Sequence, residues 1–306
     1  MNREKLSAAV LLLCCIAIWG VNAVALKAAA RPTSGPAFDA LFLSGVRFSV
    51  CAPLFALMLW RTRPELLRLS RKEVGLYVVF GFFSLFIGEM LQALAVRYTS
   101  VANLTLVGNG TVSLFTALWA WAAFREPLGR LTLPGAALAL VGVGVIASHA
   151  PGGLNLGGET WRGDALALLR SMIHGGYLLY LGRWLREHMA LQVTLYNVGF
   201  GALWALPYTV WQGIHFPWGE VSAVTWGALA WSIFPTTLFG FVAWNSAVAK
   251  IGPVAATNAM YLLPPAAALA AWAMLREPIT IWHAIGGVLI LGGIVILRWD
   301  SLMKSS

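Results

Sequence analysis

Charged side chains are scarce in this sequence. Asp, Glu, Lys and Arg supply only 11% of the residues and apolar types supply 59%, whereas soluble domains carry about 25% charged residues. A chain with so little charge cannot cover a surface that faces water, so the solvent for most of it must be lipid. Acids are the rarer sign, which leaves a net charge of +9. The basic residues nevertheless sit in short gaps between apolar runs, whereas a nucleic-acid partner needs them clustered on one exposed face. We expect no nucleic-acid partner.

Cysteine is also rare, with three residues in all. Cys14 and Cys15 are adjacent, and all three cysteines lie inside apolar segments without Cys-x-x-Cys or paired His spacing. This pattern favours thiols buried in lipid over a disulfide or a metal site. The sequence also lacks a nucleophile elbow, a His-x-x-x-His pair and clustered carboxylates, which argues against an enzyme. We therefore expect no metal and no cofactor.

Long apolar runs are abundant, and each is close to the length of about 20 residues that a transmembrane helix needs. The sequence predicts an all-α polytopic membrane protein with ten such helices and short connections. The predicted helices cover residues 6–28, 37–60, 74–97, 100–124, 130–149, 164–186, 190–212, 224–249, 253–275 and 279–298.

One stretch occurs twice. Residues 120–127, which end in Arg-Glu-Pro, are repeated by residues 271–278, 151 positions later and close to half the length of the chain. Such self-similarity indicates a duplicated unit. We expect a first five-helix repeat over 1–149, a linker over 150–163 and a second repeat over 164–306. Because each repeat has an odd number of helices, the two repeats are inverted across the membrane, an arrangement common in transporters.

The positions of Lys and Arg predict the orientation. With the N-terminus inside, 14 of the 21 basic residues fall at the cytoplasmic side and five at the outer side, while Arg47 and Arg170 lie within spans. Basic residues concentrate on the cytoplasmic side of membrane proteins. We therefore expect both termini in the cytoplasm and the chain in a bacterial inner (plasma) membrane.

These motifs resemble those of a known family. Trp19-Gly20-x-Asn22 followed by Lys27, Arg47 in the second helix, and the Arg-Glu-Pro at the ends of the fourth and ninth helices are similar to EamA-type members of the drug/metabolite transporter superfamily. The resemblance covers essentially the whole chain, and the richness in aromatic residues is most similar to the aromatic amino-acid exporters of the YddG type. It implies export by alternating access, with helices 1, 3, 4, 6, 8 and 9 around a central cavity and helices 5 and 10 at the periphery.

Four ionisable residues fall within predicted spans: Arg47, Glu89, Arg170 and His174. Such residues cost at least about 2.5–3.5 kcal/mol at the bilayer centre, so they face a cavity or a partner. Glu89 departs from the family pattern, which has an apolar residue there, and we expect it to pair with Arg47 or Arg170. The pair either carries protons or is purely structural, and the sequence leaves both open.

Helical spacing suggests which side chains face the cavity. Polar or aromatic residues recur along one face of helices 1, 3 and 6, and we take as candidates Trp19, Asn22, Phe82, Phe86, Glu89, His174 and Tyr177. Helix packing is the alternative role of such stripes. Trp244 and Tyr261, in helices 8 and 9, complete the set of candidate aromatics.

Two helices are interrupted at roughly corresponding depths. Gly108, Asn109 and Gly110 break the fourth helix, and Pro264 and Pro265 break the ninth. Paired breaks of this kind are the best indication of a transport site that a sequence offers, although passive kinks have the same pattern.

The sequence thus favours a secondary transporter that exports small amphipathic metabolites, either aromatic amino acids or aromatic and cationic amines. An intramembrane enzyme that uses His174 and Glu89 as acid and base, and a facilitator pore without ion coupling, are the alternatives. The expected partners are the lipid bilayer and a small-molecule substrate, with the chain a monomer or a weak homodimer.

Overall fold

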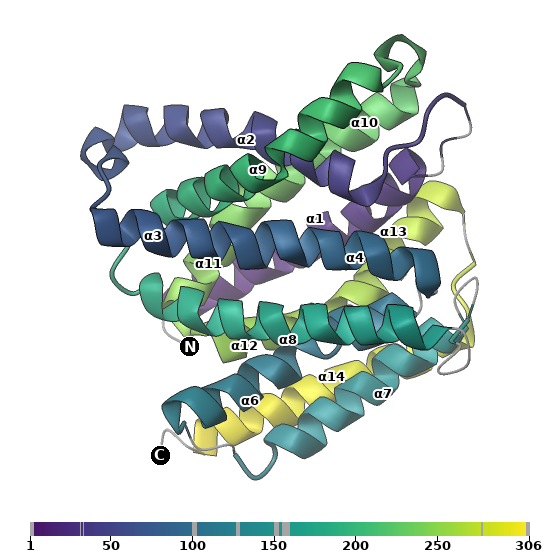
Figure 1. Ribbon diagram of the computed structural model, residues 1–306. Coiled ribbons are helices and arrows are strands. Elements are labelled where there is room, and N and C mark those ends of the chain that lie inside the picture. The colour runs from purple at the N-terminus through teal and green to yellow at the C-terminus, as the bar shows by residue number, and fades with distance from the viewer. Residues whose placement is uncertain are drawn as a thin grey trace.

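The fold is entirely helical in the part of the chain that the structure describes. The computed structural model describes residues 3–30, 32, 34–99, 103–126, 129–149, 153–154, 160–276 and 278–303, and no strand occurs among them. The helices run back and forth across the molecule: the connections between α2 and α3 and between α8 and α9 lie on the left of Figure 1, and those between α1 and α2 and between α9 and α10 lie on the right. This confirms the all-α polytopic fold.

The helical segments match the ten predicted spans closely. In chain order they are α1 Arg3–Ala30, α2 Ala40–Thr62, η1 Pro64–Leu67, α3 Arg71–Phe80, η2 Gly81–Ile87, α4 Gly88–Tyr98, η3 Leu104–Asn109, α6 Val112–Phe124, α7 Thr132–Ser148, α8 Trp161–Trp184, α9 Ala190–His215, η5 Trp218–Glu220, α10 Ala223–Trp231, η6 Ser232–Phe239, α11 Gly240–Ile251, α12 Pro253–Thr257, η7 Asn258–Leu262, α13 Leu263–Leu275 and α14 Ile281–Met303. Helix α8 begins within the predicted linker 150–163, much of which lies outside the described residues.

Five of the described helical stretches are long and apolar enough to cross a membrane by length and composition. They are Leu6–Leu26, Ala40–Thr62, Arg71–Ala95, Ala223–Ile251 and Pro253–Met274. Helices Thr132–Ser148 and Ile281–Leu297 are apolar but shorter.

The interruptions are more numerous than the sequence predicts. The third, fourth and eighth spans each contain a π-helical segment, η2, η3 and η6, where the backbone is wound more widely than in an α-helix. Single π segments of this kind are frequent at functional sites. The fourth span breaks at the predicted place, because η3 ends at Asn109 and is followed by a turn.

The ninth span is interrupted at a different place from the one predicted. Its irregular part is the 3₁₀ segment η7, and Pro264 and Pro265 lie just after it, in the first turn of α13. A proline is accepted there because the first amides of a helix have no partner within the helix. Pro264 and Pro265 therefore start a helix, and the break precedes them.

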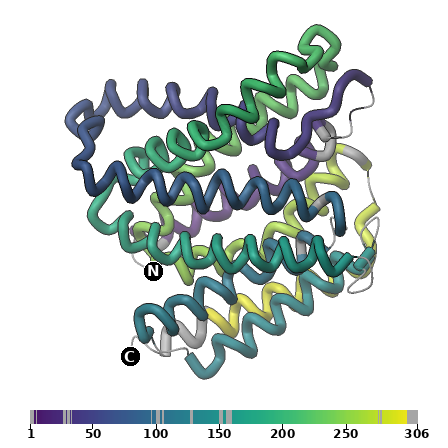
Figure 2. The backbone as a smooth tube through the Cα atoms, viewed as in Figure 1, coloured from purple at the N-terminus to yellow at the C-terminus, as the bar shows by residue number. Residues whose placement is uncertain are grey.

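Helices of the two halves pack in symmetric pairs. Helix α7 packs on α14, and both lie side by side at the bottom of the molecule (Figure 2). A Cβ atom on Gly142 would lie 2.6 Å from the carbonyl oxygen of Gly286, and one on Gly293 would lie 2.6 Å from that of Gly135. The pairing runs in opposite chain directions, so the last helices of the two halves cross antiparallel, as expected for an inverted repeat.

Two further helix pairs between the halves are related by the same symmetry. Helix α1 packs on α13 where Gly20 meets Ala266, and α8 packs on α6 where Gly175 meets Phe115. Gly20 and Gly175 are equivalent positions in the two halves of the sequence. Each half therefore contributes its first helix to a close contact with the fourth span of the other half.

Both copies of the repeated motif end their helix in the same way. Arg125 ends α6 with φ 53° and Arg276 ends α13 with φ 55°, and they are the two residues other than glycine with positive φ among those described. This left-handed conformation usually belongs to glycine at a helix C-terminus. The duplicated arginines therefore mark helix ends, as the sequence predicts.

Candidate functional site

A charged pair joins the second and third spans. Arg47 on α2 and Glu89 on α4 form an ion pair, with 3.5 Å between Arg47 Nη2 and Glu89 Oε1. Ser44, one turn before Arg47, donates its hydroxyl to Glu89 Oε2 at 2.8 Å. Arg47 is buried and its guanidinium also covers the Phe48 ring, 4.5 Å from the centroid. Of the two partners that the sequence offers to Glu89, the structure places Arg47 in contact.

Arg170 on α8 contacts the broken part of the fourth span. Its Nη1 donates to Asn109 Oδ1 at 3.2 Å, at the end of the π segment η3. The next residue, Ser171, donates its hydroxyl to the carbonyl of Gly108. The broken part of the fourth span is therefore held against α8 by a charged and a neutral side chain.

A small cavity lies beside Arg170 and Asn109. It measures about 30 Å³ and is lined by Gln92, Leu104, Gly108, Asn109, Ala167 and Arg170. The lining comes from the third, fourth and sixth spans, which the family resemblance places around the central cavity. A space of this size holds about one water molecule. We call the polar and charged side chains around this region the polar layer: Ser44, Arg47, Glu89, Gln92, Asn109 and Arg170.

Two of the predicted aromatics continue from Arg170 along α8. His174 follows one turn later and Tyr177 two turns later, with 5.7 Å between the two ring centroids. The Tyr177 hydroxyl accepts a hydrogen bond of 2.7 Å from Asn197 on α9. Ser84 of the π segment η2 donates to the same Asn197 at 3.1 Å. The face of α8 that carries Arg170 thus continues with two aromatic side chains. The hydrogen bonds of Asn197 hold the Tyr177 hydroxyl in place.

The candidate residues of the first and eighth spans contact each other. Trp19 Nε1 donates to the carbonyl of Thr236 in η6 at 3.3 Å, and its ring lies 5.2 Å from the Trp244 ring. Asn22 accepts a 2.7 Å hydrogen bond from Ser232. Trp244 and Asn22 are buried, so these residues join α1 to the π segment of the other half.

Three predicted cavity residues lie elsewhere. Phe82 and Phe86 pack on Trp204 of α9, with ring centroids 4.9 and 6.5 Å away. Trp204 is 43% exposed, so these rings are near the outer surface of the bundle. Tyr261 is fully buried in the apolar cluster between α7 and α14. The structure does not bring these three together with the polar layer.

Several polar contacts between helices are not predicted by the sequence. Ser44, Asn197 and Ser232 each bond to a predicted residue, but a single serine or asparagine in a long helix gives no periodic signal. Asn197 could have been found as a polar residue inside an apolar span, since interhelical amide bonds are common in membranes.

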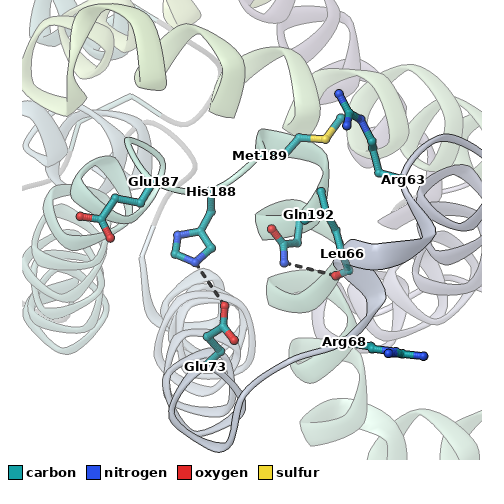
Figure 3. Close-up of a pocket in the computed structure, with 8 residues that line it drawn as sticks. All are labelled: Arg63, Leu66, Arg68, Glu73, Glu187, His188, Met189 and Gln192. Carbon is teal, nitrogen blue, oxygen red and sulfur yellow. Dashed lines mark hydrogen bonds and ion pairs between the residues drawn. The ribbon is translucent and has the colours of Figure 1, made fainter.

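A larger cavity lies at the helix ends. It measures about 530 Å³ and is lined by Arg63, Leu66, Arg68, Glu73, Glu187, His188, Met189 and Gln192. Figure 3 shows His188 and Glu73 pointing at each other, at 3.2 Å, and Gln192 donating to the carbonyl of Leu66. The lining comes from the α2–α3 and α8–α9 connections, so this cavity opens between the two halves at one face of the molecule.

The fold and the polar layer define a membrane transporter: two inverted helical halves, with broken helices meeting charged side chains between them. The chain belongs to the EamA-like transporter family, whose model matches residues 6–148 and again residues 161–299.

Relatives carry transporter names. The chain is 23% identical over 254 residues to the uncharacterized transporter YetK of Bacillus subtilis, covering 83% of this chain and 76% of that protein. It is 25% identical over 267 residues to an uncharacterized transporter of Archaeoglobus fulgidus, covering 84% and 87%. It is 27% identical over 203 residues to a probable terminal-alkyne amino-acid exporter of Streptantibioticus cattleyicolor, covering 64% and 66%.

A solved crystal structure shares the fold. It superimposes with a TM-score of 0.80 over 98% of this chain and 99% of that chain, at 19% sequence identity. At this identity the likeness shows the fold alone.

Proposed function

We propose that the protein is a secondary transporter that exports small amphipathic metabolites, with aromatic amino acids or aromatic amines as the substrate class, by alternating access. The observation that carries the proposal is the polar layer, in which the Arg47–Glu89 pair joins the second and third spans and Arg170 of the second half donates to Asn109 in the broken fourth span. The probable terminal-alkyne amino-acid exporter among the relatives supports an amino-acid substrate, without indicating an aromatic side chain. The partly buried ring of Trp19, which packs on Trp244, is one surface on which an aromatic group can stack.

Polar contacts between the halves support alternating access. At the face that carries the 530 Å³ cavity, Glu73 contacts His188 at 3.2 Å and Glu126 contacts Arg183 at 3.2 Å. At the opposite helix ends, Asp39 accepts from Tyr208 at 2.7 Å, and Asp164 accepts from Thr99 at 2.6 Å. Every contact joins a residue of one half to a residue of the other. Alternating access requires one set to break while the other set holds.

Counterflow in proteoliposomes tests the transport activity. Vesicles loaded with unlabelled phenylalanine should accumulate labelled phenylalanine transiently above its outside concentration, whereas a pore would only equilibrate the label. Vesicles without protein are the control. A chemically altered product, detected by mass spectrometry, would instead indicate the intramembrane enzyme.

A growth assay tests the substrate class in cells. Expression should protect bacteria against toxic aromatic amino-acid analogues or against quaternary amines, because export lowers the internal concentration of the toxin. Protection against neither class would contradict the proposed substrates.

We also propose how the chain is oriented in the membrane. Both termini lie in the cytoplasm of a bacterial inner membrane, which makes the face with the Glu73–His188 contact the cytoplasmic one. Fluorescent-protein fusions after α14 should fluoresce and alkaline-phosphatase fusions there should be inactive, while fusions in the α1–α2 connection should give the reverse.

A further inference from the structure

The polar layer contains one more positive charge than negative charge. Arg47 and Arg170 contribute two guanidinium groups, and Glu89 contributes one carboxylate. Arg47 is the cation that Glu89 contacts, at 3.5 Å. Glu89 acts on Arg170 only as a longer-range attraction. Among the described residues, no carboxylate lies within ion-pair distance of Arg170.

Arg170 also lacks full hydrogen bonding. Its Nη1 donates to a neutral amide oxygen on Asn109, and its Nε is buried without a partner. Arg47 likewise has an unpartnered Nε, but its Nη2 has both Glu89 and Ser44 within reach. A buried donor of a cation that has no acceptor is unfavourable, because the low-dielectric interior does not replace the water that the group has lost.

Arg170 lines the 30 Å³ cavity together with two residues that carry side-chain amides, Gln92 and Asn109. The guanidinium fork matches the two oxygens of a carboxylate and binds them in parallel. The cavity holds about one water molecule, so a carboxylate enters fully only when the fourth span and α8 separate.

We infer that Arg170 is the subsite for the carboxylate of the transported molecule. This inference rests on the proposed function and narrows it: the substrates are aromatic acids or amino acids, and amines without a carboxylate are excluded. The face of α8 that follows Arg170 carries His174 and Tyr177. A molecule bound through its carboxylate would therefore lay an aromatic side chain along these two rings.

Ligand pairs test the inference on the unaltered protein. Phenylalanine should drive counterflow, whereas phenethylamine, which lacks the carboxylate, and phenylalaninamide, in which it is neutral, should bind about 10- to 100-fold more weakly, the usual loss when a charge-assisted hydrogen bond is removed. Equal counterflow of the acid and the amine would overturn the carboxylate subsite and leave the proposed function intact. Counterflow of none of the three would contradict the proposed function itself.

Substitutions test the residue. Arg170→Gln should weaken phenylalanine binding about 10- to 100-fold, and Arg170→Lys, which keeps the charge and loses the fork, should lose less. Arg162→Gln removes the same charge from the exposed start of α8, where Arg162 lies over the Trp161 ring, and should bind normally. Equal losses in the Arg162 and Arg170 variants would overturn the assignment.

Thermal unfolding separates a binding role from a structural one. Arg170→Gln removes a partly buried charge that has no carboxylate partner among the described residues, so the free protein should melt at an equal or higher temperature while phenylalanine no longer raises that temperature. An inorganic anion is the other source of negative charge for this site. Transport of phenethylamine that depends on chloride would assign Arg170 to such an anion and overturn the inference.

Discussion

At the scale of single residues, the contact between Arg47 and Glu89 determines whether the polar layer can take up and release a proton. Arg47 is 6% exposed, and the side chain of Glu89 is 20% exposed. The two charges stabilise each other, and Ser44 supplies a further hydrogen bond to the carboxylate. The sequence leaves open whether this pair is structural or carries protons, and the two roles predict different outcomes for paired substitutions.

Glu89→Gln should reduce transport driven by a pH gradient roughly tenfold or more, because the amide cannot take up and release a proton. Transport into proteoliposomes across an imposed pH gradient measures this. Glu65→Gln, on the exposed segment η1 where Glu65 pairs with Arg63, is the matched control and should transport normally.

The same substitution also leaves Arg47 without its anion, which costs about 3–5 kcal/mol when one partner of a buried pair is removed. Arg47→Gln combined with Glu89→Gln should therefore recover the melting temperature but not the pH-driven transport. Recovery of both would identify the pair as structural and exclude Glu89 as the proton carrier.

At the scale of helices, the glycines of α7 and α14 set how closely the two halves approach. Gly286→Ala should lower the melting temperature, because its Cβ would lie 2.6 Å from the Gly142 carbonyl oxygen and such overpacking costs about 1–3 kcal/mol. Gly287→Ala is the matched control, since no atom lies within 4 Å of its added Cβ. Thermal unfolding in detergent compares the two, and equal melting temperatures would show that the helices slide apart without cost.

The C-terminus of α6 has a left-handed residue that is not glycine, Arg125. Arg125→Gly should stabilise the protein by about 1 kcal/mol, because glycine adopts the left-handed conformation without the cost that a Cβ brings. Arg125→Val should destabilise it, because a β-branched residue rarely adopts positive φ. The melting temperatures of the two variants give the order, and a lower value for Arg125→Gly would mean that the arginine side chain contributes more than its backbone strain costs.

At the scale of the whole molecule, the contacts at the two faces predict opposite effects on opening. Glu73→Ala combined with Arg183→Ala removes two contacts between the halves at one face, so this face should open more often. Spin labels at Lys72 and Arg186, in a background with Cys14, Cys15 and Cys51 replaced by alanine, should report longer distances.

Asp39→Asn is the control for that measurement, because Asp39 binds Tyr208 and Gln212 at the opposite helix ends. It should leave the distance between the labels unchanged or shorten it. Lengthening by both changes would indicate a general loosening of the structure instead of alternating access.

The number and placement of the helices could be read from the sequence, since an apolar run of about 20 residues has one stable conformation in lipid. The pairing of Glu89 was predicted only as a choice between Arg47 and Arg170, because depth along a helix says nothing about which neighbour is adjacent. Phe82 and Phe86 lie against Trp204 because π winding and the neighbouring helix decide where a stripe faces. Local spacing cannot include either effect.

The sequence by itself determined the membrane environment, the helical fold, the duplication and the helix-ending role of Arg125 and Arg276. These follow from composition and from local backbone preferences, which act over a few residues. Only the tertiary structure decided that Glu89 is paired with Arg47 and that Arg170 lines the cavity with no carboxylate of the described residues in ion-pair contact. Contacts between residues far apart in the chain depend on how whole helices pack, and charge balance in a low-dielectric interior is set by those contacts.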